Sequence, residues 1–289
     1  MPVALRNFWW LLRRAFVLAY ENGGFGVAKG AAYSALLAFF PLLTATATLL
    51  VDANAEEISR IISRALFEVV PPGTESLVSY QFTVRGQRPS TLLVAAILIS
   101  VWAATGLITS LMEGFRAAYH IPFGRPVVRE RAIAVLLVFA AAAPSVGASA
   151  LILLGERVER HVLAWVGVIP AGAELQGGVE LAGVLVRYAI ALGTIILVAA
   201  TLYYLGPNRP QKWRLVWPGA TLATVLWFLA TLGFAWYVRN IANYNLLYGS
   251  IGAVIALLAW MYVLSAIALV GCEFNAEMER TFAEEGPKG

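Results

Sequence analysis

The chain has 289 residues, of which 60% are hydrophobic and 13% are charged. A soluble domain carries about 25% charged residues, so a water-soluble core of this size cannot hide so much apolar surface. A single cysteine, Cys272, excludes an internal disulfide and a cysteine-rich metal site. The composition therefore indicates an integral membrane protein.

The first element is an amphipathic segment over residues 4–20. Trp9 and Phe16 can face lipid while Arg13 and Arg14 meet headgroups, the pattern of a helix that lies on a membrane surface. The same two arginines cut the apolar stretch short, and no cleavage site of small residues follows it. The segment is therefore not a cleavable secretory signal.

Six windows of about 20 or more residues are apolar enough to cross a bilayer. A helix rises 1.5 Å per residue, so each window can span a hydrocarbon core of about 30 Å. Barrel strands would alternate polar with apolar residues over about ten positions, and no such alternation is present. The windows are residues 30–51, 90–112, 132–154, 183–205, 216–238 and 247–271. The predicted fold class is an all-α membrane bundle of six transmembrane helices, in one domain that covers residues 1–289.

Other features refine this bundle. Pro41 and Pro144 each remove a backbone hydrogen bond inside a window, which predicts kinked helices. The loop of residues 52–89 places apolar residues at helical spacing with charged residues between them, so it is expected to hold an amphipathic helix. The loop of residues 155–180 is mixed in charge and rich in glycine toward its end.

Basic residues are distributed unequally between the two sides of this topology. With Arg187 set aside because it lies inside a window, 13 of the 21 Lys and Arg lie on the side of the termini and seven on the other side. The positive-inside rule therefore predicts that both termini are cytoplasmic. An even number of spans agrees with that orientation.

Four stretches together resemble the YihY/BrkB family of bacterial inner-membrane proteins. They are AAYSALLAFFPLL (31–43), LMEGFRAAYHIP (111–122), LYYLGPNRPQKWRLVWPGA (202–220) and YNLLYGSIGAVIALLAWMYVLSAIALVGCEFNAE (244–277). The resemblance implies a six-helix inner-membrane protein with a virulence or serum-resistance label and a historical label as a tRNA-processing ribonuclease. It also implies a link, for some members, to export of lipid-linked envelope material. Glu113 departs from the pattern, because the family mostly has neutral residues there.

The candidate site is a polar cluster where the second, fourth and sixth windows reach the cytoplasm. An arginine fork binds two phosphate oxygens at once, so the cluster could bind a phosphate or lock a gate. We expect Arg116 and Arg209 to pair with Glu113 and Glu273. The alternative is that these groups are merely solvated at helix ends. The cluster consists of Glu113, Arg116, Asn208, Arg209, Glu273 and Asn275.

Arg187 lies about one turn inside the fourth window, near its outer end. A basic residue at that depth can extend its side chain to the outer headgroups. Alternatively, it lines an outward-facing cavity or pairs with a carboxylate of an outer loop.

Catalytic patterns are absent from the sequence. The two histidines, His120 and His161, fall on opposite sides of the membrane in this topology, and Asp52 is the only aspartate. A metal-dependent or acid–base nuclease needs such groups in one pocket. The sequence also lacks the pattern G-x-x-x-x-G-K-[ST], which forms the phosphate-binding loop of many nucleotide-binding proteins. The sequence therefore predicts no enzyme, no cofactor, no metal and no nucleic-acid partner.

The function expected from the resemblance and from the basic cytoplasmic side is a transporter, or a transport component, for an amphipathic or lipid-linked envelope molecule. Its expected partners are membrane lipids, a lipid-linked substrate and envelope-assembly proteins. A structural scaffold without a substrate, an ion or proton antiporter and the ribonuclease remain alternatives. No carboxylate lies at mid-membrane depth in the six windows, which argues against the antiporter.

Overall fold

The computed structural model describes all residues except 1, 53–89, 166–177, 241–249 and 286–289. The described part of the chain forms seven α-helices and one short 3-10 helix, and it contains no strand. The elements are α1 (Pro2–Glu21), α2 (Gly24–Asp52), α5 (Ser90–Ala118), α6 (Val127–Trp165), α7 (Gly178–Leu205), η1 (Trp213–Leu215), α8 (Trp217–Asn240) and α10 (Ser250–Glu285).

Six of the described helices are long and apolar enough to cross a membrane. They are α2, α5, α6, α7, α8 and α10, and each one contains most of a predicted window. The all-α bundle is therefore confirmed. The predicted helix in residues 52–89 falls almost entirely outside the described residues, and so do residues 166–177 of the loop of residues 155–180.

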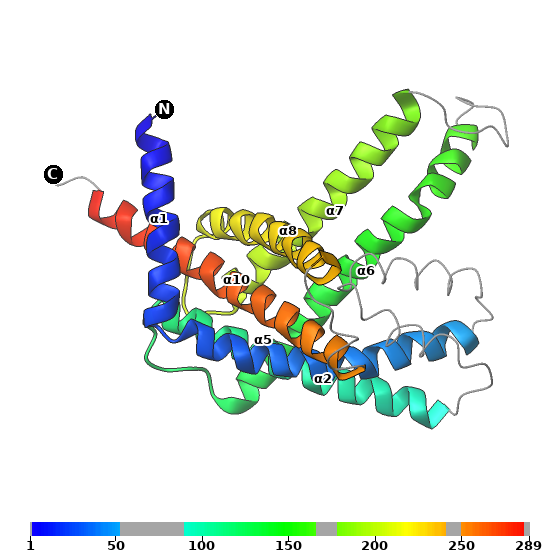
Figure 1. The fold of residues 1–289 in the computed structure, drawn as a ribbon, viewed down its shortest axis with the longest axis horizontal. Helices are drawn as coiled ribbons and strands as arrows, with labels where there is room; N and C mark the ends of the chain where they lie inside the picture. The colour runs from blue at the N-terminus through cyan, green and yellow to red at the C-terminus, as the bar shows by residue number, and fades with distance from the viewer. Residues whose placement is uncertain (1, 53–89, 166–177, 241–249, 286–289) are drawn as a thin grey trace.

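Helix α1 is the predicted surface helix, and Figure 1 shows it lying across the direction of α2 and α10. Gly23 adopts a φ of +74° in the turn between α1 and α2, a conformation that glycine adopts without steric cost. Ala15 of α1 packs against Phe274 and Met278 of α10. The opposite face leaves Trp9 and Phe16 exposed, as the amphipathic pattern predicts.

Helices α2 and α5 pack through small residues. A Cβ on Gly106 would lie 3.1 Å from the Ser34 hydroxyl, and a Cβ on Gly30 would lie 3.7 Å from the Ser110 hydroxyl. Gly30 and Ser34 on α2 thus meet Ser110 and Gly106 on the antiparallel α5. Small residues four positions apart allow membrane helices to approach closely, which gives these two helices their van der Waals contact.

Helix α10 crosses α8 at two glycines. A Cβ on Gly271 would lie 2.8 Å from both the Gly219 carbonyl oxygen and the Cβ of Ala223, and 2.5 Å from the Tyr203 hydroxyl. No side chain fits at this crossing. Gly219 and Gly271 therefore allow α7, α8 and α10 to meet at one point.

Helices α6 and α7 form a pair that diverges from the other helices in Figure 1. Helix α6 continues to Trp165, beyond the predicted end at residue 154. Pro41 and Pro144 both lie within helices that continue past them, so neither proline ends its helix.

The last helix differs most from its prediction. We expected it to end at Gly271, but α10 continues to Glu285. Residues 272–285 contain no proline or glycine and are mostly good helix formers. Gly271 serves the helix crossing rather than a helix end, so Glu273 and Asn275 lie inside the helix and not beyond it.

The crossing predicts unequal effects for two glycine substitutions in α8. Gly219→Ala places a methyl group against the Gly271 carbonyl, so we expect it to lower the free energy of unfolding by about 1–3 kcal/mol. Gly233→Ala has open space around it and is the control, expected to change stability by less than about 0.5 kcal/mol. Thermal unfolding in detergent measures both, and equal melting temperatures for the two variants would contradict the crossing.

Candidate functional site

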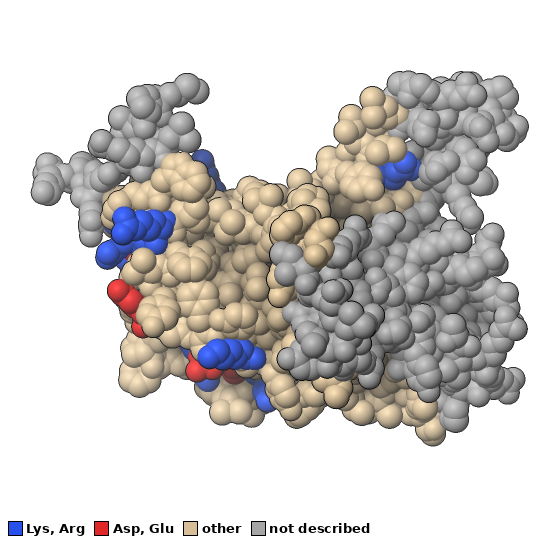
Figure 2. Space-filling model, in the orientation of Figure 1, with Lys and Arg blue, Asp and Glu red and all other residues tan. Residues whose placement is uncertain are grey.

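The charged side chains of the described residues gather at one end of the bundle. This end, called the charged end below, comprises α1, the starts of α2, α6 and α8, and the ends of α5, α7 and α10. In Figure 2 the blue and red side chains cluster toward α1 and the end of α10, and the rest of the described face is almost entirely tan. Arg187 is the exception among the described charged side chains, because it lies near the other end of α7. The charged end therefore holds the polar groups available for a site.

Glu273 lies buried on α10 with 2% of its surface exposed. Its Oε1 accepts a hydrogen bond of 2.6 Å from the side-chain amide of Asn22, at the end of α1. Its Oε2 has no hydrogen-bond partner among the described residues. An interior carboxyl group with one unsatisfied oxygen is costly, so this position is not a solvated helix end.

Asn275 is completely buried. Its Oδ1 accepts a bond of 2.7 Å from the backbone N–H of Gly219, and its Nδ2 donates a bond of 3.0 Å to the carbonyl of Val216. The first N–H groups of a helix have no partner within that helix. Asn275 therefore caps the start of α8 from a neighbouring helix, which is a structural role.

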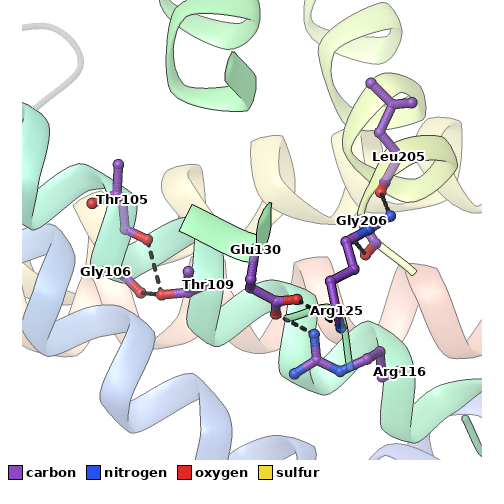
Figure 3. Close-up of polar contacts among 8 residues, drawn as sticks. All are labelled: Thr105, Gly106, Thr109, Arg116, Arg125, Glu130, Leu205 and Gly206. Atoms are coloured by element: carbon purple, nitrogen blue, oxygen red, sulfur yellow. Dashed lines mark hydrogen bonds and ion pairs between the residues drawn. The ribbon is translucent and has the colours of Figure 1, made fainter. Parts of the chain in front are cut away.

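Arg116 and Arg125 both contact Glu130, in the first turn of α6, as Figure 3 shows. Arg116 forms an ion pair with the Glu130 carboxylate, and the backbone N–H of Arg125 donates to its other oxygen at 3.3 Å. The Arg125 guanidinium donates to the carbonyls of Leu205 and Gly206 at 2.7 and 3.0 Å. A cation there suits the negative end of the α7 dipole. These contacts join the ends of α5, α6 and α7.

Arg209 forms an ion pair with Glu279 and lies over the ring of Tyr119, 4.3 Å from its centroid. Burial raises the pKa of the Tyr119 hydroxyl well above its ordinary value, so this side chain stays neutral. The neutral ring face attracts the guanidinium. Arg209 is therefore held on two sides, by an ion pair and by a ring.

The predicted pairing of the cluster is wrong. Arg116 pairs with Glu130 and Arg209 pairs with Glu279, so neither arginine contacts Glu113 or Glu273. Glu113 is exposed and has no polar partner among the described residues. The reason is geometric: α10 continues as a helix, which directs Glu273 toward α1 and brings Glu279 to Arg209.

Sequence reasoning missed a second buried carboxylate, Glu277, with 6% of its surface exposed. It accepts bonds of 3.1 Å from both Arg14 of α1 and Arg280 of α10. Arg280 also donates a bond of 2.6 Å to the carbonyl of Ala118 at the end of α5. The spacing of Glu273 and Glu277, one helical turn apart, was the signal, but it has meaning only if the helix continues.

Arg187 is 7% exposed, so the expectation that it extends to the outer headgroups is wrong. Its aliphatic stem packs against α6, where a Cβ on Gly155 would lie 2.5 Å from the Arg187 Cδ. Gly155 thus makes room for an arginine between α6 and α7. A role in an outer cavity stays a prediction.

A central cavity of about 300 Å³ lies between the spanning helices. Residues from α2, α5, α6, α7, α8 and α10 line it, and most of them are apolar. Phe115 and Tyr203 lie at the side of the cavity nearest the charged end, both almost fully buried and in edge-to-face contact with ring centroids 5.2 Å apart. Ser145 of α6 and Trp227 of α8 line the cavity and are exposed, so they mark its rim.

Apart from the Trp227 indole at the rim, the polar side chains that line this cavity are hydroxyls whose hydrogens already form hydrogen bonds. Tyr203 donates to the Ala268 carbonyl at 2.7 Å, and Ser145, Thr224 and Ser265 donate to carbonyls of their own helices. Each hydroxyl oxygen keeps acceptor capacity. The described residues of the cavity thus offer mainly apolar surface and a few acceptors, with no Lys or Arg among them, which suits a hydrocarbon chain better than a phosphate.

The two histidines lie far apart, as the topology predicted. His120 precedes α6 at the charged end, whereas His161 lies near the other end of that helix, about 50 Å away along its axis. No group of three or more His, Cys, Asp or Glu that could hold a metal ion occurs in the described part of the chain.

Comparison with known proteins identifies the family. The family described as Virulence factor BrkB matches residues 16–289. The chain belongs to this family. The resemblance to the YihY/BrkB proteins is therefore confirmed.

Three relatives of this BrkB-family protein are similar to it over most of their length. The putative ribonuclease-like protein YfkH of Bacillus subtilis is 28% identical, with 88% of this chain and 90% of the relative covered. A UPF0761 membrane protein of Tolumonas auensis is 26% identical, with 99% and 96% covered. One of Alteromonas mediterranea is also 26% identical, with 89% and 85% covered. No solved structure matches the chain.

The cap formed by Asn275 predicts a stability effect in this BrkB-family protein. Asn275→Ala leaves the Gly219 N–H and the Val216 carbonyl buried without the amide, so we expect a loss of about 1–3 kcal/mol. Asn208→Ala is the control, because Asn208 is exposed and has no polar partner among the described residues. Chemical denaturation in detergent compares the two. A loss of similar size in the control would show that the cap contributes nothing particular.

The half-satisfied carboxyl group of Glu273 predicts that its charge is not needed for folding. Glu273→Gln keeps an oxygen for Asn22 and buries a neutral group, so we expect a melting temperature at or above that of the wild type. Glu273→Ala removes the acceptor and leaves a void, at an expected cost of about 1–3 kcal/mol. If both variants melt at the same lowered temperature, the carboxylate itself is required for the fold.

Proposed function

We propose that this protein is a transporter, or a component of one, for an amphipathic or lipid-linked envelope molecule. The central cavity is the observation that supports it. A scaffold needs only close packing between its helices, whereas here side chains from all six spanning helices surround about 300 Å³ of space. Its apolar lining fits the hydrocarbon part of an amphipathic molecule.

The charged end supplies complementary chemistry for the other part of such a molecule. Among the described residues it carries more Lys and Arg than Asp and Glu, and it lies beyond Phe115 and Tyr203 as seen from the cavity. Arginine forks are suited to phosphate. The proposed substrate therefore keeps its tail in the cavity and its anionic head toward the basic side of the bundle.

The proposed location is the bacterial cytoplasmic membrane, with the charged end and both termini in the cytoplasm. The support is the excess of Lys and Arg on the side of the termini, together with six spanning helices. The relatives named as membrane proteins agree with a membrane location. Lipids are then its immediate partners, and envelope-assembly proteins are proposed ones.

The transport proposal predicts that a bulky residue at the cavity rim stops activity. Ser145→Trp places an indole where the cavity opens, whereas Ser149→Trp, one turn further along α6, changes a serine that is also exposed but does not line the cavity. The measurement is transbilayer movement of fluorescent amphipathic lipids in vesicles that contain the purified protein. We expect wild type and Ser149→Trp to accelerate this movement and Ser145→Trp to fall to the rate of protein-free vesicles.

Far-UV circular dichroism and thermal unfolding show that each variant is folded. Equal activity of the two tryptophan variants would contradict a path through the central cavity. If wild-type protein gives the rate of empty vesicles with every lipid tried, the scaffold alternative is favoured.

A further inference from the structure

A groove of about 770 Å³ lies where α1 crosses α8 and α10. The groove and the central cavity are separate spaces, because they lie on different faces of α10. Ile267 lies between these faces and lines both. The lining of the groove comes from four helices. The lining residues are Trp9, Leu12, Arg13, Phe16, Val17, Phe25, Leu226, Leu229, Ala230, Tyr262, Val263, Ala266, Ile267 and Val270.

The groove follows the membrane-spanning direction. Its α10 side extends from Tyr262 to Val270, a rise of about 12 Å along the helix. Leu226 and Leu229 of α8 form the facing wall. Because α8 and α10 are spanning helices, this part of the groove opens to the hydrocarbon region of the bilayer. A hydrocarbon chain is the ligand that its surface and surroundings fit.

Among the described residues that line the groove, Arg13 is the charged one. It is exposed on α1 and forms no hydrogen bond or ion pair with any described residue. Its neighbour Arg14 is instead bound to Glu277 at 3.1 Å. An amphipathic helix lies at the boundary of headgroups and acyl chains, which puts a basic side chain on its edge at headgroup level. The groove therefore has a cation at one end and apolar walls below it.

We propose that this groove binds one membrane phospholipid with an anionic headgroup. The acyl chain lies along α8 and α10, and the phosphate lies on the Arg13 guanidinium, whose fork binds two of its oxygens. The bound lipid also covers Trp9 and Phe16, which are otherwise exposed. It thus fastens α1 to the bundle, a role that goes beyond the proposed transport and uses a different surface.

Native mass spectrometry of the full-length protein tests the headgroup part of the proposal. The protein in detergent is titrated with phosphatidylglycerol and, separately, with phosphatidylcholine. We expect wild type to prefer phosphatidylglycerol and Arg13→Gln to weaken that binding about five-fold, the contribution of one basic residue at a membrane surface. Arg129→Gln is the matched control, because it removes the same charge at the charged end from an exposed residue outside the groove.

Ala230→Trp tests the groove itself, since an indole at this position fills the space between α8 and α10. We expect it to weaken binding of both lipids, with thermal unfolding used to confirm that the variant is folded. If it does not fold, the contrast between Arg13→Gln and Arg129→Gln decides.

Equal losses of phosphatidylglycerol binding in Arg13→Gln and Arg129→Gln would overturn the proposal. They would show that the overall positive charge of the protein, and not this groove, attracts the anionic lipid. Unchanged lipid binding in a folded Ala230→Trp variant would also overturn it. So would a wild-type dimer that Ala230→Trp dissociates, since the groove would then be an interface between two copies of the chain.

Discussion

The polar side chains that α10 carries past Gly271 are buried inside the protein, where an unpaired polar group is costly, so they depend on partners from neighbouring elements. Glu273, Asn275 and Glu277 do so on three different neighbours. Glu273 accepts from Asn22 in the α1–α2 turn, Asn275 caps α8, and Glu277 holds Arg14 of α1 and Arg280. The close approach of Gly219 and Gly271 brings the helices near enough for these bonds to form. The end of α10 therefore organises the charged end.

The same region closes the central cavity toward the charged end. Tyr203 lines the cavity, bonds to Ala268 of α10 and packs against Phe115 of α5. Any conformation that opens the cavity toward the charged end must separate at least one of these contacts. In the proposed function, a movement of α10 would then change the shape of the cavity and the packing of α1 together, because α10 lines the cavity and contacts α1.

Hydropathy and length predicted the six spanning helices and the surface helix, because these depend on local composition. The polar cluster was predicted in part. Glu273 and Asn275 lie at the charged end, but their partners depend on α10 continuing through Gly271, and a glycine at a helix crossing has the same local signature as one at a helix end. Glu277 and Glu130 were missed for the same reason: a carboxylate near a helix end appears solvated until the packing of its neighbours is known.

The central claim is that a hydrocarbon chain enters the cavity between the spanning helices. Photo-crosslinking with a lipid that carries a diazirine in its acyl chain, followed by peptide mapping, tests it most directly. We predict labelled peptides that include cavity-lining Ile195 of α7 and Leu264 of α10. Labelling confined to residues on the exposed outer face, such as Leu98 and Phe228, would contradict the claim and leave a closed bundle in its place.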